Sequence, residues 1–332
     1  MMNQFKVVVM CSAGSRTGGP EASFQLVNEL NELGLAAQIW LVTQPQITAI
    51  ESAMGRGERI GDQPELLASQ SNGFEEYAHY LHTPFDGNFD SKTQFVVAEK
   101  YLHLVPYLLN ARPVVWWLSV DNAFQSLAKI NLNFLRLEQV RHLHQCEYAH
   151  QVLSALGMIS LPVYDYTVVD ESTAPLPVES RPMRLALNAG RKVIFPLKRF
   201  SQQLTQAEPG LEVVLLQGLE RQQVYDTLRS ARLFYDMGSF PGNDRMYREA
   251  ALFGTPVMAL RVAGAASGTA EALADLYRPH AQEAMSGRVV QQILHMLRHP
   301  HLHAESGARL QSRVRQERVV FREQVMQAFL GA

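Results

Sequence analysis

The sequence predicts an α/β fold whose parallel sheets are divided between two domains. Lys6–Met10 (KVVVM) has the pattern of a short buried strand, a glycine-containing loop follows it, and Ala37–Thr43 (AQIWLVT) has the pattern of a second strand. Between them lies an apolar helical stripe that Gly34 ends, formed by Leu26, Val27, Leu30 and Leu33. In the second half, Phe234–Leu260 repeats the order of strand, glycine- and proline-containing loop, helix and strand. This order, with its glycine-containing turn, is typical of doubly wound sheets.

Composition limits the possible functions. The chain has 332 residues, enough for two domains, and it is 47% hydrophobic and 19% charged, as globular proteins are. Its formal net charge of −2 gives no basic field for nucleic acid. Cys11 and Cys146 make no disulfide framework, and we expect reduced thiols in the cytoplasm. We find no secretory signal and no apolar run of roughly 18 residues, so we expect a soluble protein.

One carboxylate in the first half is placed for chemistry. Thr93–Val97 has a strand pattern, a helix is expected around Tyr101–Leu109, and Pro113–Val120 (PVVWWLSV) has the pattern of a buried strand. Asp121 follows this strand directly, where α/β enzymes place catalytic or ligand groups. Asp121 is therefore a candidate general base or substrate-positioning carboxylate. The alternative is that Asp121 or Asn122 caps the next segment.

The histidines do not predict a metal site. His142, His144 and His150 lie near Cys146, but their spacing fits neither a zinc finger nor an HExxH helix. A second group flanks Pro300, between two helical patterns of the tail, and we expect it in an exposed loop: His295, His299, His301 and His303. We therefore expect no metal ligands.

The second half begins after a linker. Thr167–Pro182 (TVVDESTAPLPVESRP) has three prolines, several polar residues and no periodicity, which indicates an interdomain connection. Strands are expected at Met183–Leu187 and Leu211–Gly218. The last tail helix is striped with apolar side chains at Leu310, Val314, Phe321, Val325 and Phe329. Its arginines would suit anionic lipid headgroups, although Glu317 and Glu323 interrupt the basic run.

The strand–loop–helix–strand stretch of the second half is the strongest candidate for ligand binding. Asn243 and Asp244 are candidate caps of a helix from about Arg245 to Phe253. The start of that helix offers free N–H groups and a partial positive charge that suit a phosphate. Glu249, one turn later, offers a carboxylate that can accept hydrogen bonds from two ribose hydroxyls. The alternative is a solvated helix face on which Arg245 pairs with Glu249.

Four sequence runs resemble one family. PGNDRMYREAALFGTPVMA (241–259) looks like the donor-site segment of bacterial GT-B glycosyltransferases of the family 4-like kind that build surface polysaccharides. GGPEASFQLVNELNELGLAAQIWLV (18–42) is similar to their GG-x-E loop and first helix. WWLSVDN (116–122) looks like another of their segments, and HLHQCEYAHQVLSALG (142–157) resembles the last strand and helix of their N-terminal domain. The resemblance implies an α/β fold of GT-B architecture, with two Rossmann-like domains whose parallel sheets face a central cleft.

The resemblance also implies roles for residues in both halves. Glu249 would hold the ribose of the donor, and the loop of Gly18 and Gly19 would lie near donor and acceptor, although close packing explains these glycines equally well. Arg191 and Lys192, or Lys198 in their place, match a basic pair that offsets charge on the leaving diphosphate. Further donor contacts are expected from Gly238, Ser239, Gly242, Asp244 and Arg245. Glu21 matches the acid of the glycine motif, or is an acid favoured at a helix start, and Gln145 and Tyr148 are expected near the cleft.

One departure from the family stands in the same stretch. Family 4 enzymes commonly carry a Glu eight residues before the ribose Glu, where this chain has Pro241. The usual contact to the transferred sugar, and with it the stereochemical outcome, is therefore not predicted.

The sequence thus predicts four segments. Residues 1–166 form an N-terminal Rossmann-like acceptor domain, 167–182 a linker, 183–311 a C-terminal Rossmann-like donor domain, and 312–332 a helix that crosses back to the N-terminal domain. The resemblance implies transfer of a sugar from a nucleoside diphosphate sugar to a hydroxyl of a glycan or lipid-linked acceptor, in cell-surface polysaccharide or glycan synthesis. We expect no cofactor, no nucleic acid partner and a cytoplasmic location with peripheral membrane contact.

Two other functions remain open. A nucleotide-sugar epimerase can share the two-domain architecture, but it needs carboxylates and a histidine converging on the sugar, a set that we cannot identify in the sequence. A non-catalytic relative that binds glycan or nucleotide, or that scaffolds a partner glycosyltransferase, is favoured by Pro241.

Overall fold

The chain divides into two compact units, which are described separately. The computed structural model describes residues 5–14, 17–58, 63–70, 75–108, 110–170, 176–188, 193, 195–239, 242–266 and 273–331. Unit 1 comprises Met1–Asp165 and Val319–Ala332, and unit 2 comprises Tyr166–Arg318. The chain therefore passes between the units twice, after Asp165 and after Arg318.

Unit 1 is built on a six-stranded parallel sheet in the order β2-β1-β3-β4-β5-β6. Strands buried on both faces need continuous apolar runs, which β1 and β4 supply. Its elements are β1 (Lys6–Ser12), α1 (Gly18–Glu32), β2 (Ala36–Val42), α2 (Gln44–Gly55), α3 (Pro64–Leu67), η2 (Glu75–Tyr77), β3 (Gln94–Ala98), η3 (Glu99–Leu108), β4 (Arg112–Trp117), η4 (Val120–Ala123), α4 (Phe124–Leu127), α5 (Leu132–Leu135), β5 (Arg141–His144), α6 (Glu147–Ala155) and β6 (Ser160–Pro162), where η marks a 3-10 helix.

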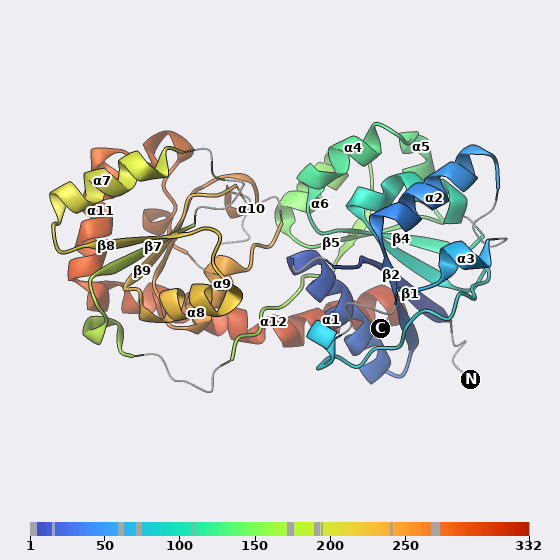
Figure 1. Ribbon diagram of the computed structural model, residues 1–332, viewed down its shortest axis with the longest axis horizontal. Helices are drawn as coiled ribbons and strands as arrows, with labels where there is room; N and C mark the ends of the chain where they lie inside the picture. Colours follow the sequence, from blue (N-terminus) through green and yellow to red (C-terminus); the bar gives the residue numbers. More distant parts are fainter. Residues whose placement is uncertain are drawn as a thin grey trace. The chain divides into compact units, whose positions relative to one another are not determined.

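Side-chain alternation divides the core of unit 1 between the two faces of its sheet. Val8 and Met10 of β1 join a cluster that includes Ile50 of α2 and Leu153 of α6. The intervening Val9 points to the opposite face, where α1 and the end of α12 (Ala304–Leu330) lie (Figure 1). The helices α2, α4 and α6 lie on the first face (Figure 1).

The last strand of unit 1 was not predicted. We expected the segment after Arg141 to hold the final strand and helix, but β6 follows α6 and pairs with β5. With three residues, SLP, β6 is too short for a periodic pattern.

Unit 2 contains a four-stranded parallel sheet in the order β10-β9-β7-β8. The helices α8 and α9 pack together on one side of it and α7 lies on the other (Figure 1). Besides α12, its elements are η5 (Val178–Ser180), β7 (Arg184–Asn188), α7 (Leu197–Ala207), β8 (Glu212–Leu216), α8 (Arg221–Ser230), β9 (Leu233–Asp236), α9 (Met246–Leu252), β10 (Val257–Ala259), α10 (Ala263–Ala266), η6 (Asp275–Tyr277), η7 (Ala281–Glu283), α11 (Gly287–Arg298) and η8 (Pro300–His303).

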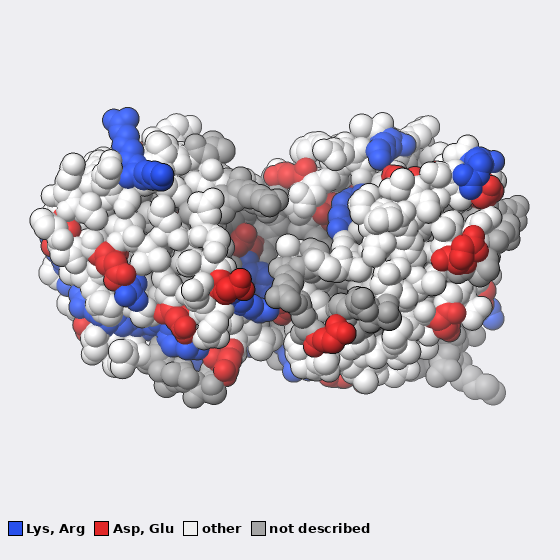
Figure 2. Space-filling view, viewed as in Figure 1, with Lys and Arg blue, Asp and Glu red and all other residues white. Residues whose placement is uncertain are grey.

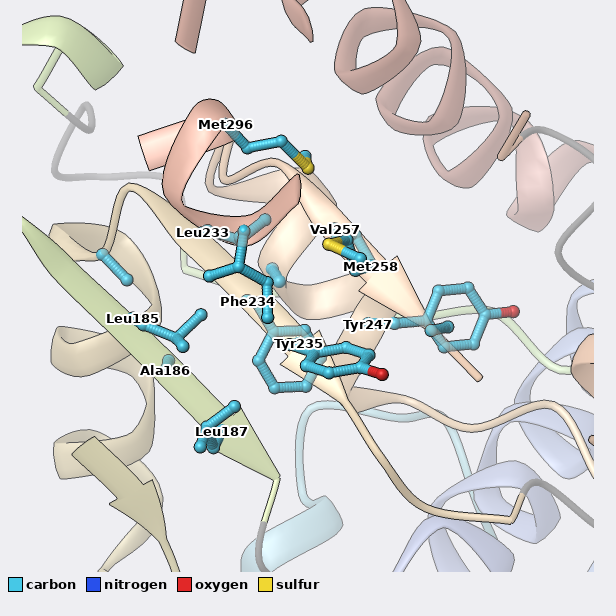
Figure 3. Close-up of a cluster of buried hydrophobic side chains, with 14 of the residues drawn as sticks. Leu185, Ala186, Leu187, Leu233, Phe234, Tyr235, Tyr247, Val257, Met258 and Met296 are labelled. Carbon is cyan, nitrogen blue, oxygen red and sulfur yellow. The ribbon is translucent and has the colours of Figure 1, made fainter. Parts of the chain in front are cut away.

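Apolar side chains of three neighbouring strands, β7, β9 and β10, fill the centre of unit 2. Figure 3 shows Leu185 to Leu187 of β7 beside Leu233 to Tyr235 of β9, with Met296 of α11 above them. Tyr235 packs edge-on against Phe200 of α7, with ring centroids 6.3 Å apart. This rigid sheet fixes the carboxyl ends of β7 and β9.

A buried arginine anchors the incoming chain to unit 2. Arg181 is 2% exposed, and its Nε and Nη2 atoms donate to the carbonyl oxygens of Leu176 and Phe253, both at 2.9 Å. Its Nη1 donates to the Ala231 carbonyl at 2.9 Å and to Thr255 Oγ1 at 2.7 Å. Arg181 thereby joins the chain before β7 to the turn that ends α9.

The final helix contributes to both units. Its residues up to Arg318 belong to unit 2, and those from Val319 onward belong to unit 1, where Arg322 pairs with Glu29 and with Glu32 of α1. Among the helices that the structure describes, none combines enough length with enough apolar character to pass through a lipid bilayer.

The prediction of an exposed histidine loop near the C-terminus was wrong for two members, because His295 lies within α11 and His303 is buried. Residues Pro300–His303 form η8, and His303 is buried at 7% exposure. His303 Nδ1 lies 2.7 Å from the Tyr277 hydroxyl and Nε2 lies 3.3 Å from His295 Nδ1. Burial and the neighbouring histidines lower the pKa of His303. Because Tyr277 is distant from His303 in the sequence, no local pattern predicts this contact.

Charged side chains of both signs are interspersed on the visible face (Figure 2). This agrees with the small net charge of −2.

Replacing Arg181 with alanine should destabilise the protein. The buried carbonyl groups of Ala231 and Phe253 and the partly buried one of Leu176 would lose their donor, which we expect to cost about 2–4 kcal/mol in the free energy of unfolding, measured by urea titration. The matched control is Arg288→Ala, which removes an exposed pair with Glu283 and should cost at most about 1 kcal/mol. Equal effects of the two substitutions would contradict the anchoring role.

Glu99 should make stability depend on pH. It is buried, its Oε2 accepts the Leu118 N–H at 2.9 Å, and burial raises the pKa of its carboxyl from 4.5 to about 7. Because the unfolded chain releases this proton first, the contribution is complete below pH 4.5 and is lost as the pH rises to about 7.

Urea titrations of wild type and Glu99→Gln across this range measure the effect. The difference in free energy of unfolding between wild type and Glu99→Gln should change between these pH values, because wild type becomes less stable relative to the variant as the pH rises. Glu138→Gln, at an exposed position, is the control. Parallel pH profiles for wild type and Glu99→Gln would refute the assignment.

Candidate functional site

The carboxyl ends of β7 and β9 form the centre of the candidate site in unit 2. These strands are neighbours although β8 separates them in sequence, so the strand order reverses between them. Open α/β sheets bind ligands at such a reversal. Asn188 Nδ2 donates to Asp236 Oδ1 at 2.7 Å, and the Gly238 N–H donates to the same oxygen at 2.8 Å. Asp236 is fully buried.

A side chain at position 238 would crowd this arrangement. A Cβ at this position would lie 3.0 Å from Asp236 Oδ1 and 3.2 Å from Asn188 Nδ2. Gly238 and Gly242 are buried, and Ser239 is half-buried. Of the loop between them, residues 240 and 241, the latter the proline that departs from the family, lie outside the described residues.

The start of α9 is partly occupied by the chain itself. Asp244 Oδ1 accepts the Met246 N–H at 3.1 Å, so this amide, which the sequence suggested for a phosphate, already has a partner. Arg245 is the N-cap residue, in helical conformation, and its side chain does not cap the helix. The helix has only seven residues.

Glu249 faces inward from α9. It is 8% exposed, and Tyr225 of α8 donates its hydroxyl to Oε1 at 3.2 Å. Arg221 Nε donates to the Tyr225 hydroxyl at 2.8 Å. Burial raises the pKa of Glu249 despite the opposing charges of Arg245 and Arg221 and the hydrogen bond from Tyr225. Burial raises the pKa of Tyr225 to about 12, which keeps it a donor.

The alternative of a solvated face is wrong for two charges of α9. Arg248 has no exposed side-chain surface, and Glu249 is almost as buried. No hydrogen bond or ion pair links Arg245 to Glu249 among the described residues; the hydrogen bond of Glu249 is to Tyr225.

Only one of the three predicted basic residues is described. Lys198 is exposed at the second position of α7. Arg191 and Lys192 lie outside the described residues, so their contact with the donor diphosphate stays a prediction.

The glycine loop of unit 1 opens a long, buried helix. Gly18 and Gly19 are the first residues of α1. A Cβ at Gly19 would meet only Leu118 Cδ1 at 3.8 Å, an ordinary contact, so packing within the described residues does not demand glycine there. Glu21 is buried, and its Oε1 accepts a hydrogen bond from Tyr80 at 3.3 Å.

Two predicted residues of unit 1 come together. Asp121, in η4 directly after β4, accepts a hydrogen bond from the hydroxyl of Tyr148 at 3.1 Å. Burial, followed by the charge of Asp121, raises the pKa of Tyr148. Gln145 does not join them, since its Nε2 donates to Asp165 at 2.8 Å in a buried contact. Asp121 and Tyr148 thus form one polar pair at the carboxyl edge of the sheet.

Sequence reasoning missed a polar group at the strand reversal of unit 1, where β1 meets β3. Ser12 Oγ lies 2.8 Å from the Tyr101 hydroxyl, and Lys100 Nζ donates to Ser12 Oγ. Lys100 also lies over the Tyr101 ring, 4.7 Å from its centroid. Only the strand order brings the ends of β1 and β3 together, so no local pattern would have found the group.

In unit 2 the missed residues are Asn188, Tyr225 and Arg221. Asn188 ends a recognisable strand, so its position was available, but its pairing with Asp236 depends on the strand order. In the described part of the chain, no three His, Cys, Asp or Glu side chains are grouped to hold a metal ion.

Comparison with known proteins identifies the fold. No family model matches the sequence, and no curated protein matches it. Solved structures do match. HepE of Anabaena in complex with UDP-glucose has a TM-score of 0.62 and 14% identity, over 99% of this chain and 100% of that one.

Two further structures match along nearly the whole chain. A glycosyltransferase from Rickettsia africae has a TM-score of 0.56 and 11% identity, over 99% of this chain and 97% of that one. A protein from Listeria monocytogenes named as a UDP-N-acetylglucosamine 2-epimerase has a TM-score of 0.52 and 14% identity, over 92% and 91%. At such identities the likeness concerns the fold. The chain has an α/β fold of GT-B architecture with two parallel sheets, as the sequence predicted.

Proposed function

We propose that the protein is a glycosyltransferase that moves a sugar from a nucleoside diphosphate sugar to a hydroxyl acceptor. The observation that carries this proposal is the burial of Glu249 in the first turn of α9, with Tyr225 donating to one carboxylate oxygen. A buried carboxylate is retained only where hydrogen bonds compensate it. The two hydroxyls of a ribose would supply such donors, and the fold is shared with a structure that binds UDP-glucose.

The remaining roles follow from the chemistry of the leaving group. A nucleoside diphosphate leaves with growing negative charge, which fixed cations and backbone N–H groups stabilise. We assign Arg191 and Lys192 to this task, with Lys198 as the alternative, and the backbone of Gly238, Ser239 and Gly242 to the diphosphate. In unit 1 we assign Gly18 and Gly19 to the donor side, and Asp121 to positioning or deprotonating the acceptor.

We further propose a membership and a setting for this activity. The sequence runs at 18–42 and 241–259 support a family 4-like enzyme of surface-polysaccharide or glycan synthesis, with residues 1–166 binding the acceptor, 167–182 linking, 183–311 binding the donor and 312–332 crossing back. The enzyme would act in the cytoplasm, at the inner face of the membrane, without a metal.

A second candidate is a nucleotide-sugar epimerase, which the Listeria structure favours. An epimerase converts UDP-N-acetylglucosamine without an acceptor, whereas a transferase releases UDP in proportion to glycosylated acceptor. Product analysis after incubation with UDP-N-acetylglucosamine, UDP-glucose and an acceptor mixture distinguishes them. Nucleotide binding with no turnover would favour the non-catalytic alternative.

Glu249→Gln should weaken nucleotide binding. We expect one of UDP, GDP, dTDP and ADP to bind wild type selectively in calorimetry, and the substitution to weaken it about 30-fold, since hydrogen bonds to a charged acceptor contribute about 2 kcal/mol. Glu283→Gln, outside the site, is the control. If no nucleotide binds wild type at millimolar concentration, the assignment of the donor site is wrong.

Tyr225→Phe tests how the carboxylate is held. Removing the hydroxyl takes one donor from Glu249 and separates it from Arg221, so we expect the selected nucleotide to bind about tenfold more weakly. Tyr107→Phe, at an exposed position in unit 1, is the control. Unchanged affinity in Tyr225→Phe would mean that Glu249 needs no support from α8.

A further inference from the structure

Arg248 fixes the loop that leads into α9. Its side chain is completely buried, with Nε donating to the Asp244 carbonyl at 2.9 Å and Nη2 donating to the Asn243 carbonyl at 2.7 Å. The loop also carries Gly242, and the Tyr247 hydroxyl donates a further hydrogen bond to Asn243 Oδ1 at 2.9 Å. One guanidinium therefore sets the direction of two consecutive peptide groups beside Glu249.

The same guanidinium is paired with a carboxylate of another helix. Arg248 Nη1 donates to Glu317 Oε2 of α12 at 2.9 Å, and the Glu317 side chain is 17% exposed. A buried cation that loses such a partner is strongly destabilised. The flat guanidinium makes three directed contacts at once, which a lysine ammonium cannot reproduce with the same geometry.

Glu317 also marks where the chain passes between the units. Its Oε2 accepts the backbone N–H of Thr167 at 3.1 Å. Thr167 is the second residue of unit 2 after the first crossing, and Glu317 is the last but one before the second crossing. One carboxylate oxygen thus joins both crossings to Arg248.

A second tie between α12 and α9 is separate from this network. Gln311 Nε2 donates to the Leu252 carbonyl at 3.0 Å, at the far end of α9. It holds the helix without contacting the loop. The loop conformation is therefore set at the Arg248 end.

We propose that Arg248 is the positioning residue of the loop Gly242–Asp244, and that through Glu317 it couples this loop to both chain crossings. Two sites that share one network influence each other reciprocally. A ligand bound at the loop should then change the stability of the hydrogen bond at Thr167. A change at Glu317 should likewise alter the stability of the loop. The identity of the occupant, a nucleoside diphosphate, rests on the function proposed above, but the coupling does not.

Amide hydrogen exchange of the whole protein without ligand tests the coupling. In Glu317→Gln, exchange in peptides covering 242–247 and Thr167 should become about tenfold faster, because a charge-assisted contact is lost at one end of the network. Two controls should leave both peptides at the wild-type rate. Glu305→Gln removes an exposed carboxylate of α12, and Gln311→Ala removes the separate tie. Wild-type exchange in the 242–247 peptide of a folded Glu317→Gln protein would overturn the proposal.

Arg248→Lys provides a second variant should Glu317→Gln fail to fold. This substitution keeps the positive charge but removes the planar guanidinium with its directed N–H donors, so both peptides should again exchange faster. Urea midpoints of the variant and wild type separate this local change from a general loss of stability. Wild-type exchange in both peptides of Arg248→Lys would show that the guanidinium of Arg248 does not position the loop Gly242–Asp244.

Adding UDP to wild type separates the two proposals. Slower exchange at both 242–247 and Thr167 supports the coupling, and slower exchange at 242–247 alone overturns it while leaving nucleotide binding intact. If UDP and the other nucleotides do not bind but Glu317→Gln still accelerates loop exchange, the donor-site assignment fails and the coupling stands.

Discussion

The buried carboxylate of Asp236 is the constraint on which the ligand-binding edge of the four-stranded sheet depends. A charge at this depth is tolerated only when donors surround it, and Asn188 and the Gly238 N–H supply two of them. The carboxylate therefore holds the chain in a tight turn directly after β9 and would crowd a Cβ at position 238. This turn leads the chain into α9, whose two charged side chains, Arg248 and Glu249, are buried.

Much of the fold could be predicted because its signals are local. The apolar run Lys6–Met10, the striped helix after it and the strand that follows were read correctly in kind and order. So was the strand, loop, helix and strand of 234–260, where glycines and prolines mark the ends of regular structure. The candidate site could be located by the same means, since strand ends are visible in sequence. The inward position of Glu249 was one of two open alternatives.

What could not be predicted depends on which elements meet. The strand orders bring Asn188 to Asp236 and Ser12 to Tyr101, and no local pattern contains them. The sequence of a short helix does not show whether its charged side chains face solvent or buried partners. The partner of Arg248 comes from α12, and the partner of Glu249 comes from α8. His303 was misplaced for the same reason, because its partner Tyr277 comes from a distant turn.

The division of α12 between the units has a consequence for biosynthesis. Phe321, Val325 and Phe329 are buried, and they belong to unit 1, whose other described elements end with β6. A ribosome makes all of unit 2 before it makes these three side chains. Domains generally fold from the N-terminus as they emerge, but here the core of unit 1 can be completed only after this part of α12 has been made. Unit 1 is therefore completed after unit 2 has been made, and its unfinished core is the surface that a chaperone would have to cover.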